Sequence, residues 1–175
     1  MRSLKGEKLY LRALEPVDIE FLSDIENDLN YWHLSQTQTP FSRYILQKYL
    51  DNAHQDIYEA KQLRLVISTY EDIPAGFIDL YDFDFKNQRA GVGIMIIEEF
   101  RGLGYASEAL EILCTYAFTE LQLHQLYACI NSDNYESLAL FNKHNFVQIG
   151  LKKDWNFHQG KFQDEYLLQK INNVY

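Results

Sequence analysis

The alternation of hydrophobic and polar residues predicts strands and helices along most of the chain. Residues 8–14 alternate as a strand, and Glu15 and Pro16 open a helix. The polar stretch 31–40, which ends in a proline, is expected to be an irregular connection. Ser42 is placed to cap a second helix. The predicted buried faces are Phe21, Leu22 and Ile25 in the first helix and Ile45, Leu46, Tyr49, Leu50 and Ala53 in the second.

Three strands are predicted in the centre of the chain. Residues 63–69 and 75–83 form a hairpin, and residues 90–97 form the third strand. Gly91 and Gly93 permit a bulge or the close approach of another group in that strand. We therefore expect a ligand near the end of the third strand.

The remaining elements alternate between helix and strand. A helical period begins at residue 106, a short buried strand covers 126–130, and a helix covers 134–144. Segments 146–155 and 161–171 form a terminal hairpin. The order is βααβββαβαββ, without repeats or a linker, which predicts a single domain over residues 1–175.

Composition narrows the class of partner. The formal net charge of -9 disfavours nucleic acid and anionic membranes and suits a cationic small molecule, although acidity serves solubility alone in many proteins. Cys114 and Cys129 lie in apolar stretches, which favours two buried, reduced thiols and a cytoplasmic location. No apolar run approaches the roughly 20 residues that span a bilayer, and the five histidines show no metal-ligand spacing. We expect no metal and no membrane partner.

The most informative segment is the loop between the third central strand and the next helix. It reads Arg101-Gly102-Leu103-Gly104-Tyr105-Ala106. Free amides at a helix N-terminus bind phosphate, and the two glycines let the backbone approach an anion. A kinase-type P-loop is excluded because no Gly-Lys-Ser/Thr follows, and the dinucleotide fingerprint is incomplete. Two interpretations remain. The loop is a pyrophosphate site, or it is a glycine-rich start of a helix that binds no ligand.

At these residues the chain resembles the Gcn5-related N-acetyltransferase (GNAT) superfamily, whose loop reads Gln/Arg-x-x-Gly-x-Gly/Ala. Arg101, Gly104 and Ala106 match that pattern. The segment INSDNYESLALFNKHNF, the opening KLYLRALEPVDIEFL and the closing GKFQDEYLL extend the resemblance over nearly the whole chain. They are similar to the branch that contains spermidine acetyltransferases and ribosomal-protein alanine acetyltransferases.

The resemblance implies a mixed α/β fold, of the α+β type, with a twisted sheet splayed between its fourth and fifth strands and helices on both faces. Acetyl-coenzyme A would be the cosubstrate, with its pantetheine arm in the V. The implied contacts are the backbone of Met95, Ile96 and Ile97, the loop amides of residues 101–106, and Asn134. Asn134 is also a common type of helix N-cap. A homodimer would be usual for the family.

Direct transfer to an amine needs an oxyanion donor, a base and an acid. The resemblance implies a backbone amide near Ile96 or Ile97 as the oxyanion donor. Many relatives carry a tyrosine acid where this chain has Phe141, so Ser137, Tyr135 or solvent would protonate the thiolate. Glu98 is the carboxylate nearest in sequence to the acetyl site and is the candidate base, ahead of Asp79 and Glu99.

The acceptor is expected to be a cation. An acidic rim favours a polyamine, and two aromatic residues supply cation-π contacts. The candidates are Glu26, Asp28, Asp79, Asp82 and Asp84 for the rim, with Trp32 and Tyr81 as the aromatic residues. A protein N-terminus is the rival acceptor. A non-catalytic acetyl-coenzyme A sensor is the alternative of another class, because a phenyl ring at position 141 donates no proton.

Overall fold

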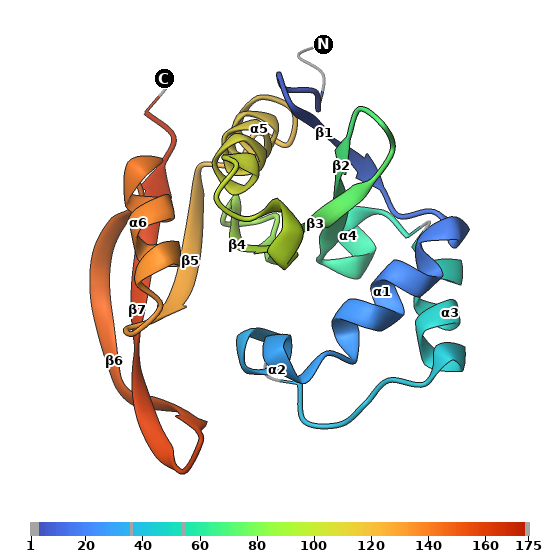
Figure 1. Ribbon diagram of the computed structural model, residues 1–175. Helices are drawn as coiled ribbons and strands as arrows, with labels where there is room; N and C mark the ends of the chain where they lie inside the picture. The colour runs from blue at the N-terminus through green and yellow to red at the C-terminus, as the bar shows by residue number, and fades with distance from the viewer. Residues whose placement is uncertain (1–3, 36, 54, 174–175) are drawn as a thin grey trace.

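The computed structural model describes residues 4–35, 37–53 and 55–173. Seven strands form one mixed sheet in the order β1-β2-β3-β4-β5-β7-β6 (Figure 1). The strands are β1 (Leu9–Ala13), β2 (Leu63–Thr69), β3 (Pro74–Asp84), β4 (Arg89–Ile96), β5 (Gln125–Asn131), β6 (Val147–His158) and β7 (Lys161–Ile171). The predicted strands are confirmed, with bounds that differ by up to three residues.

The helices follow the predicted order, with short additions. They are η1 (Pro16–Asp18), α1 (Ile19–Glu26), α2 (Leu29–Ser35), α3 (Arg43–Asp51), α4 (Ile57–Ala60), η2 (Glu98–Phe100), α5 (Tyr105–Thr119) and α6 (Tyr135–Lys143). The predicted irregular connection over residues 31–40 is wrong in its first part, which belongs to α2. Two local hydrogen bonds hold this helix: Asp28 Oδ1 accepts from the Asn30 amide (2.8 Å), and Trp32 Nε1 donates to the Glu26 carbonyl (2.9 Å).

Helix α3 begins as predicted but buries less of its apolar stripe. Ser42 Oγ accepts a hydrogen bond from the Ile45 amide (3.2 Å), which confirms the cap. Leu46 and Leu50 are buried, whereas Ile45 is 48% exposed and Tyr49 is 36% exposed. The buried residues of α3 pack against α1 and the sheet. Ile45 faces outward, whereas the ring of Tyr49 lies 6.0 Å from the Arg64 guanidinium.

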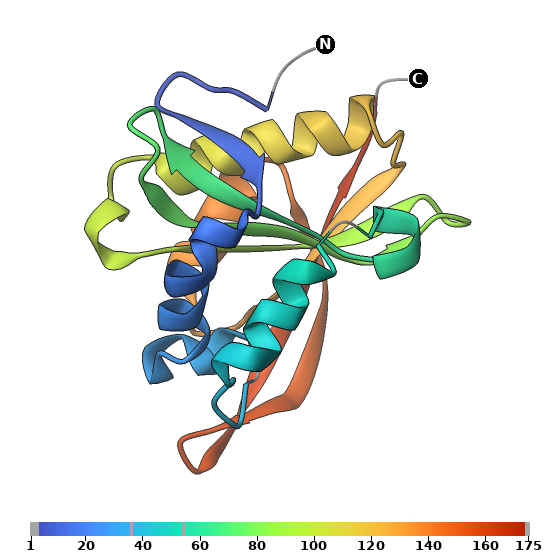
Figure 2. The same ribbon diagram turned by 90° about the vertical axis from the view of Figure 1, so that its right-hand side faces the viewer.

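Helices cover both faces of the sheet, so the inner strands of its first half have buried residues on two sides. In β2, Leu65 and Ile67 pack in the core under α5, whereas Val66 packs in the core beneath α1 and α3. Figure 2 shows α5 along one face and α1 and α3 across the other. This two-sided burial explains why the central strands read as apolar runs as well as alternating patterns.

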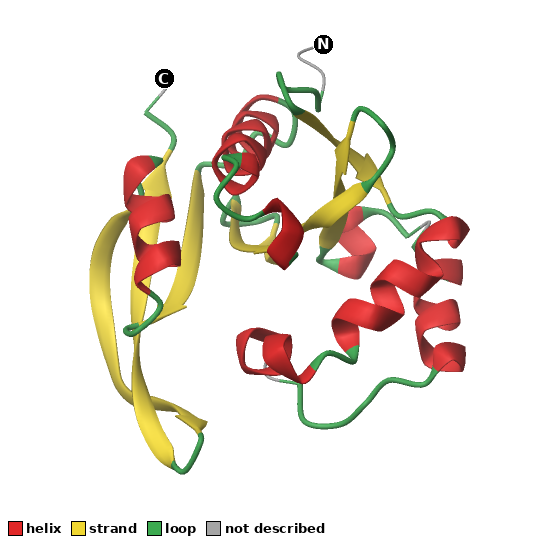
Figure 3. Ribbon diagram, viewed as in Figure 1, coloured by secondary structure: helices red, strands yellow, loops and turns green. Residues whose placement is uncertain are grey.

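The sheet divides between β4 and β5. These parallel strands pair at only three positions, Arg89 with Gln125, Ala90 with Leu126 and Gly91 with Tyr127. Beyond them, β4 continues with β3 and β5 continues with β7, so the two halves diverge. The expected splay between the fourth and fifth strands is confirmed. The β6–β7 hairpin extends past the end of β5 on one side of the opening (Figure 3).

The two cysteines differ in burial. Cys114 and Cys129 are free, and burial raises the pKa of Cys114 to about 11. Cys129 is only partly buried, contrary to the expectation of two buried thiols. In the described part of the chain, no helix is long and apolar enough to cross a membrane.

The lack of a side chain at Gly76 lets β3 approach β4 closely near the open end of the splay. Gly76→Ala tests this close approach. A Cβ at position 76 would lie 2.0 Å from the Met95 carbonyl oxygen, whereas a Cβ at Gly93 would meet nothing closer than 3.9 Å. We expect Gly76→Ala to lower the free energy of unfolding by about 2–3 kcal/mol and Gly93→Ala by less than about 1 kcal/mol. Urea denaturation measures both, and equal effects would contradict the close approach.

Candidate active site

The glycine loop has the backbone conformation that an anion site requires. Gly102 and Gly104 have φ values of 72° and 85°, and Gly104 is the N-cap of α5. The amides in the first turn of α5 have no acceptor within the helix and point out of its N-terminus. The loop and the following residue line a cavity of about 930 Å³. This geometry fits the pyrophosphate of coenzyme A.

Two side chains hold the loop in place, one from the loop itself and one from the start of the chain. Arg101 Nε donates to the Ile96 carbonyl (3.0 Å), and Lys8 Nζ donates to the Leu103 carbonyl (3.0 Å). Leu103 does not line the cavity, and its side chain is 53% exposed. Its predicted contact with the cofactor therefore does not fit the structure, and its carbonyl instead accepts the hydrogen bond from Lys8. The other five residues of the loop line the cavity.

Three residues beside the loop add polar groups that the motif did not identify. Lys143 Nζ donates to Ser107 Oγ (3.0 Å), and the same hydroxyl lies 2.8 Å from His144 Nε2. Burial, followed by the charge of Lys170, lowers the pKa of His144, so its ring is neutral at neutral pH. The cations near the loop are therefore Arg101, Lys8 and Lys143.

The free edge of β4 identifies which backbone groups face the cleft. The Ile97 amide donates to the Ala75 carbonyl (2.9 Å), so it is not available for the pantetheine arm. Hydrogen-bonding directions alternate along a strand, so Met95 also directs its backbone to β3. The backbone groups of Ile96, and of Ile94, which was not predicted, point to the edge of β4 that no longer pairs with β5. Of the three backbone segments predicted to contact the pantetheine arm, Ile96 is the one that faces the cleft.

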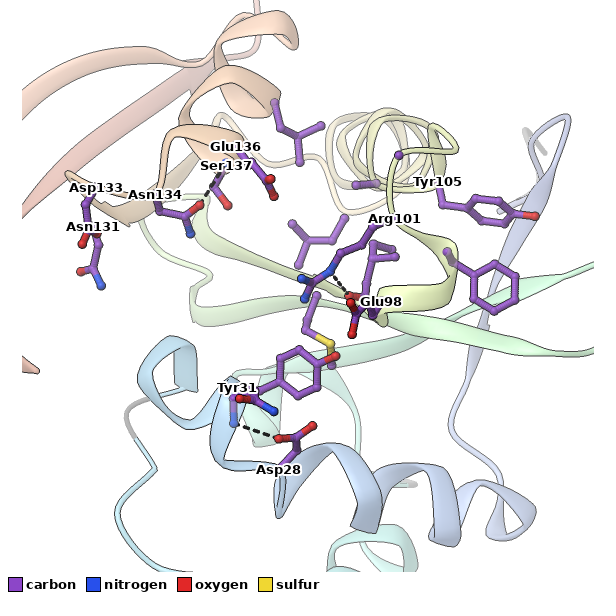
Figure 4. A pocket seen from close by; sticks show the side chains of 18 of the residues that line it. Asp28, Tyr31, Glu98, Arg101, Tyr105, Asn131, Asp133, Asn134, Glu136 and Ser137 are labelled. Atoms are coloured by element: carbon purple, nitrogen blue, oxygen red, sulfur yellow. Dashed lines mark hydrogen bonds between the residues drawn. The ribbon is translucent and has the colours of Figure 1, made fainter. Parts of the chain in front are cut away.

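A second cavity, of about 620 Å³, lies on the other side of the divided sheet. Six residues line both cavities and define a waist between them. The waist residues are Tyr31, Ile94, Met95, Asn131, Asn134 and Ser137. Figure 4 shows Tyr31 on one side of the opening and Asn134 and Ser137 on the opposite side. A donor in one cavity and an acceptor in the other would meet at this waist.

Asn134 has both of the roles considered from the sequence. Its Oδ1 accepts a hydrogen bond from the Ser137 amide (3.2 Å), which is the N-cap of α6. The residue also lines both cavities. The cap therefore holds Asn134 at the waist.

The structure separates the candidate catalytic residues. Ser137 lines both cavities, whereas Glu98 lines only the first, on the side of the glycine loop. Tyr135 lines neither cavity, and its side chain is 75% exposed, so it does not fit the role of an acid. Phe141 lines the second cavity, is 2% exposed and packs edge-on against Phe146, with ring centroids 4.9 Å apart.

The predicted acidic rim is partly neutralised by an arginine. Arg64 donates from Nε and Nη2 to Asp79 (2.8 and 2.9 Å) and from Nη1 to Glu26 (2.5 Å). Burial by itself would lower the pKa of Arg64. The charge of Asp79 and its hydrogen bonds to the guanidinium, together with the charges of Tyr49 and Glu26, outweigh burial and raise that pKa. An arginine in an otherwise apolar strand needs a buried partner, and that pattern could have identified it.

Four of the seven predicted acceptor residues line the second cavity: Glu26, Asp79, Asp82 and Tyr81. Asp84 lines neither cavity and accepts hydrogen bonds from Asn87. Asp28 lines the first cavity instead and caps the start of α2. Trp32 lines neither, because its indole is held by the Glu26 carbonyl. The positions of Asp28 and Trp32 follow from α2, which turns the chain where an irregular connection was expected.

Tyr81 forms an aromatic wall of the second cavity. A Cβ on Gly91 would lie 2.3 Å from its ring, so the glycine leaves space for it, and Tyr127 packs edge-on at 5.9 Å. Burial, followed by Cys129 and Tyr127, raises the pKa of Tyr81 well above its ordinary range. The phenol therefore stays protonated at neutral pH.

The opposite wall carries a second polar network, which sequence reasoning missed. Glu165 is 6% exposed, forms an ion pair with Lys152 and accepts from Asn156 Nδ2 (2.7 Å). Asn156 also donates to Asn131 Oδ1 at the waist (2.6 Å). These residues come from β5, β6 and β7, so their proximity depends on strand pairing that the sequence does not display.

Comparison with known proteins agrees with this geometry. Residues 8–147 match the model of the acetyltransferase (GNAT) domain. The chain belongs to the GNAT family. It is an acetyl-coenzyme A-dependent N-acetyltransferase, and its relatives include the expected spermidine acetyltransferase branch.

Two enzymes illustrate the similarity. The chain is 28% identical over 170 residues to the spermidine N(1)-acetyltransferase of Vibrio cholerae, covering 94% of this chain and 95% of that protein. It is 25% identical over 157 residues to the Escherichia coli K12 spermidine N(1)-acetyltransferase, covering 88% and 81%. A crystal structure of the Vibrio cholerae enzyme with CoA and spermine has a TM-score of 0.87 at 24% identity and covers 95% of this chain and 96% of that one, which shows the GNAT fold.

No group of three or more His, Cys, Asp or Glu side chains in the described ranges could hold a metal ion. The expectation of a metal-free enzyme stays a prediction, as do the expected homodimer and cytoplasmic location.

Arg64→Gln tests the charge balance of the second cavity. Removing the guanidinium leaves two enclosed carboxylates without their partner, so we expect the free energy of unfolding to fall by roughly 3 kcal/mol at neutral pH. Urea denaturation at neutral pH measures it.

Arg43→Gln is the matched control, because Arg43 forms an ion pair with Glu20 in which both side chains are 65% exposed. Its effect should stay below about 1 kcal/mol. Equal losses for the two variants would contradict a structural role for Arg64.

Gly104→Asp tests the anion site. Its positive φ strains any side chain, and Gly104→Ala measures that strain without added charge. We expect Gly104→Asp to weaken coenzyme A binding at least about tenfold more than Gly104→Ala, because its carboxylate repels the pyrophosphate. Titration calorimetry compares the variants, and equal affinities would exclude the loop as the pyrophosphate site.

Proposed function

We propose that this N-acetyltransferase acetylates a primary amine of a polyamine or of another small cationic amine. The observation that carries the proposal is the charge of the second cavity. Within the described residues, its charged lining consists of Glu26, Asp79, Asp82, Glu165 and Arg64. Negative charge is in excess, which attracts an ammonium ion and raises its local concentration.

The relatives support the same class of acceptor. Both enzymes compared above are named as spermidine N(1)-acetyltransferases, and the Vibrio cholerae crystal structure contains CoA and spermine. The acidic walls of the second cavity and the adjoining aromatic ring of Tyr81 supply the contacts that such a substrate needs. The proposal thus rests on the chemistry of the cavity as well as on similarity.

The two cavities divide the binding of donor and acceptor. In this proposal the loop amides bind the pyrophosphate, and the backbone of Ile94 and Ile96 pairs with the pantetheine arm as an added strand. The acetyl group then lies at the waist. The Ile96 amide is the proposed oxyanion donor, because the Ile97 amide is engaged with Ala75.

The acceptor amine enters from the acidic cavity. Its nitrogen attacks the thioester carbon, a C–N bond forms, and the C–S bond breaks as the amine loses a proton to water. Glu98 lies on the donor side of the waist, so it does not fit the role of a base acting on this amine. Glu26 and Asp79, held by Arg64, orient the incoming cation.

A thiol-release assay over an amine panel tests the proposal. The panel contains spermidine, spermine, diamines, aminoglycosides and N-terminal peptides, each with acetyl-coenzyme A. We expect spermidine and spermine to give the highest kcat/KM, because each carries several ammonium groups for the acidic walls.

Two other outcomes would replace the proposal. Turnover with peptides alone would identify a protein N-terminal acetyltransferase. Calorimetric binding of acetyl-coenzyme A without thiol release from any amine would favour the sensor, for which Phe141 is the supporting observation.

A further inference from the structure

The departing thiolate needs a proton, and the waist restricts its source. Five of the six waist residues have aliphatic, thioether, amide or hydroxyl side chains, which are weaker acids than a phenol. The sixth is Tyr31, a phenol. It therefore combines an ionisable proton with a position on both cavities.

Tyr31 is fixed in this position from two sides. Its backbone amide donates to the Asp28 carbonyl (3.0 Å), within the turn that starts α2. The Arg101 guanidinium lies over its ring, 5.7 Å from the centroid. Arg101 is itself bonded to the Ile96 carbonyl, which belongs to the free edge of β4. Figure 4 shows the ring of Tyr31 directed towards Arg101 and Glu98 at the end of that strand.

The other aromatic residues near the cavities are placed less suitably. Tyr81 lines only the acceptor cavity, and its raised pKa makes it a reluctant proton donor. Tyr105 lines only the donor cavity and packs edge-on against Phe100, with centroids 5.3 Å apart. Phe141 has no proton to donate. Tyr31 is thus the phenol that both cavities share.

We propose that Tyr31 is the general acid of the reaction and that Arg101 is its positioning residue; this inference rests on the proposed acetyl transfer. As the C–S bond breaks, the electron pair stays on sulfur, and the Tyr31 hydroxyl proton moves to it. The phenolate then recovers a proton from water. The amine has released one proton to water, so the overall reaction yields the amide and the free thiol in balance.

Tyr31→Phe removes the proton and keeps the ring. We expect kcat with spermidine to fall about 100-fold while KM changes little, because the variant loses proton transfer and not binding. The fall of kcat at high pH that deprotonation of the phenol produces should also disappear. Tyr44→Phe is the matched control, because Tyr44 is 66% exposed on α3 and lines neither cavity.

The double variant Tyr31→Phe/Phe141→Tyr separates chemistry from structure. Phe141 lines the acceptor cavity, so a hydroxyl at that position restores a phenol beside the reacting groups. We expect the kcat of the double variant to be at least tenfold higher than that of Tyr31→Phe. Recovery, together with the changed pH profile, supports proton donation by Tyr31.

Three results would overturn the inference. They are wild-type kcat in Tyr31→Phe, a loss that Tyr44→Phe reproduces, or a loss that keeps the wild-type pH profile and is not recovered by Phe141→Tyr. Failure of the proposed function looks different, because the wild-type enzyme would then release no thiol with any amine of the panel.

Discussion

The parting of β4 from β5 is the constraint on which the rest of the site depends. After Gly91 pairs with Tyr127, neither strand offers hydrogen bonds to the other. Backbone groups on the exposed edge of β4 then need other partners, and a ligand with amide groups satisfies them as a short added strand. The same parting separates the two cavities and leaves a waist between them. The two cavities and the waist thus follow from one interruption in the sheet, and the proposed donor and acceptor sites depend on it.

Charge in the acceptor cavity is fixed by internal partners. Arg64 holds Glu26 and Asp79 on one wall, and Lys152 holds Glu165 on the other. Carboxylates held in this way keep their geometry before a substrate arrives, so less ordering is needed on binding. The cations reduce the excess of negative charge without removing it, since Asp82 adds a further carboxylate to the lining.

Helix α2 connects the acceptor half of the site to the cofactor loop. It begins at the turn around Asp28, and the indole of Trp32 anchors it to the end of α1. Tyr31 on this helix meets Arg101 of the loop, which in turn contacts the end of β4. Three segments that are distant in the sequence therefore converge at the waist. A displacement of α2 would change both cavities together.

The sequence by itself determined the order of the elements, the glycine loop and the cap at Asn134. These features are local, because a helix period, a strand alternation and a cap depend on residues a few positions apart. It also selected Glu26, Asp79 and Tyr81, which line the second cavity. Family resemblance added the divided sheet.

The tertiary structure decided the remaining features of the site. Strand register turned Ile94 and Ile96 to the cleft and engaged Ile97 with Ala75. Long-range packing brought Arg64 to two carboxylates and moved Tyr135 out of the site. It also brought Tyr31 to the waist, from a stretch that looked irregular. Such contacts join residues far apart in the chain, and no local pattern records which distant partner a polar side chain will meet.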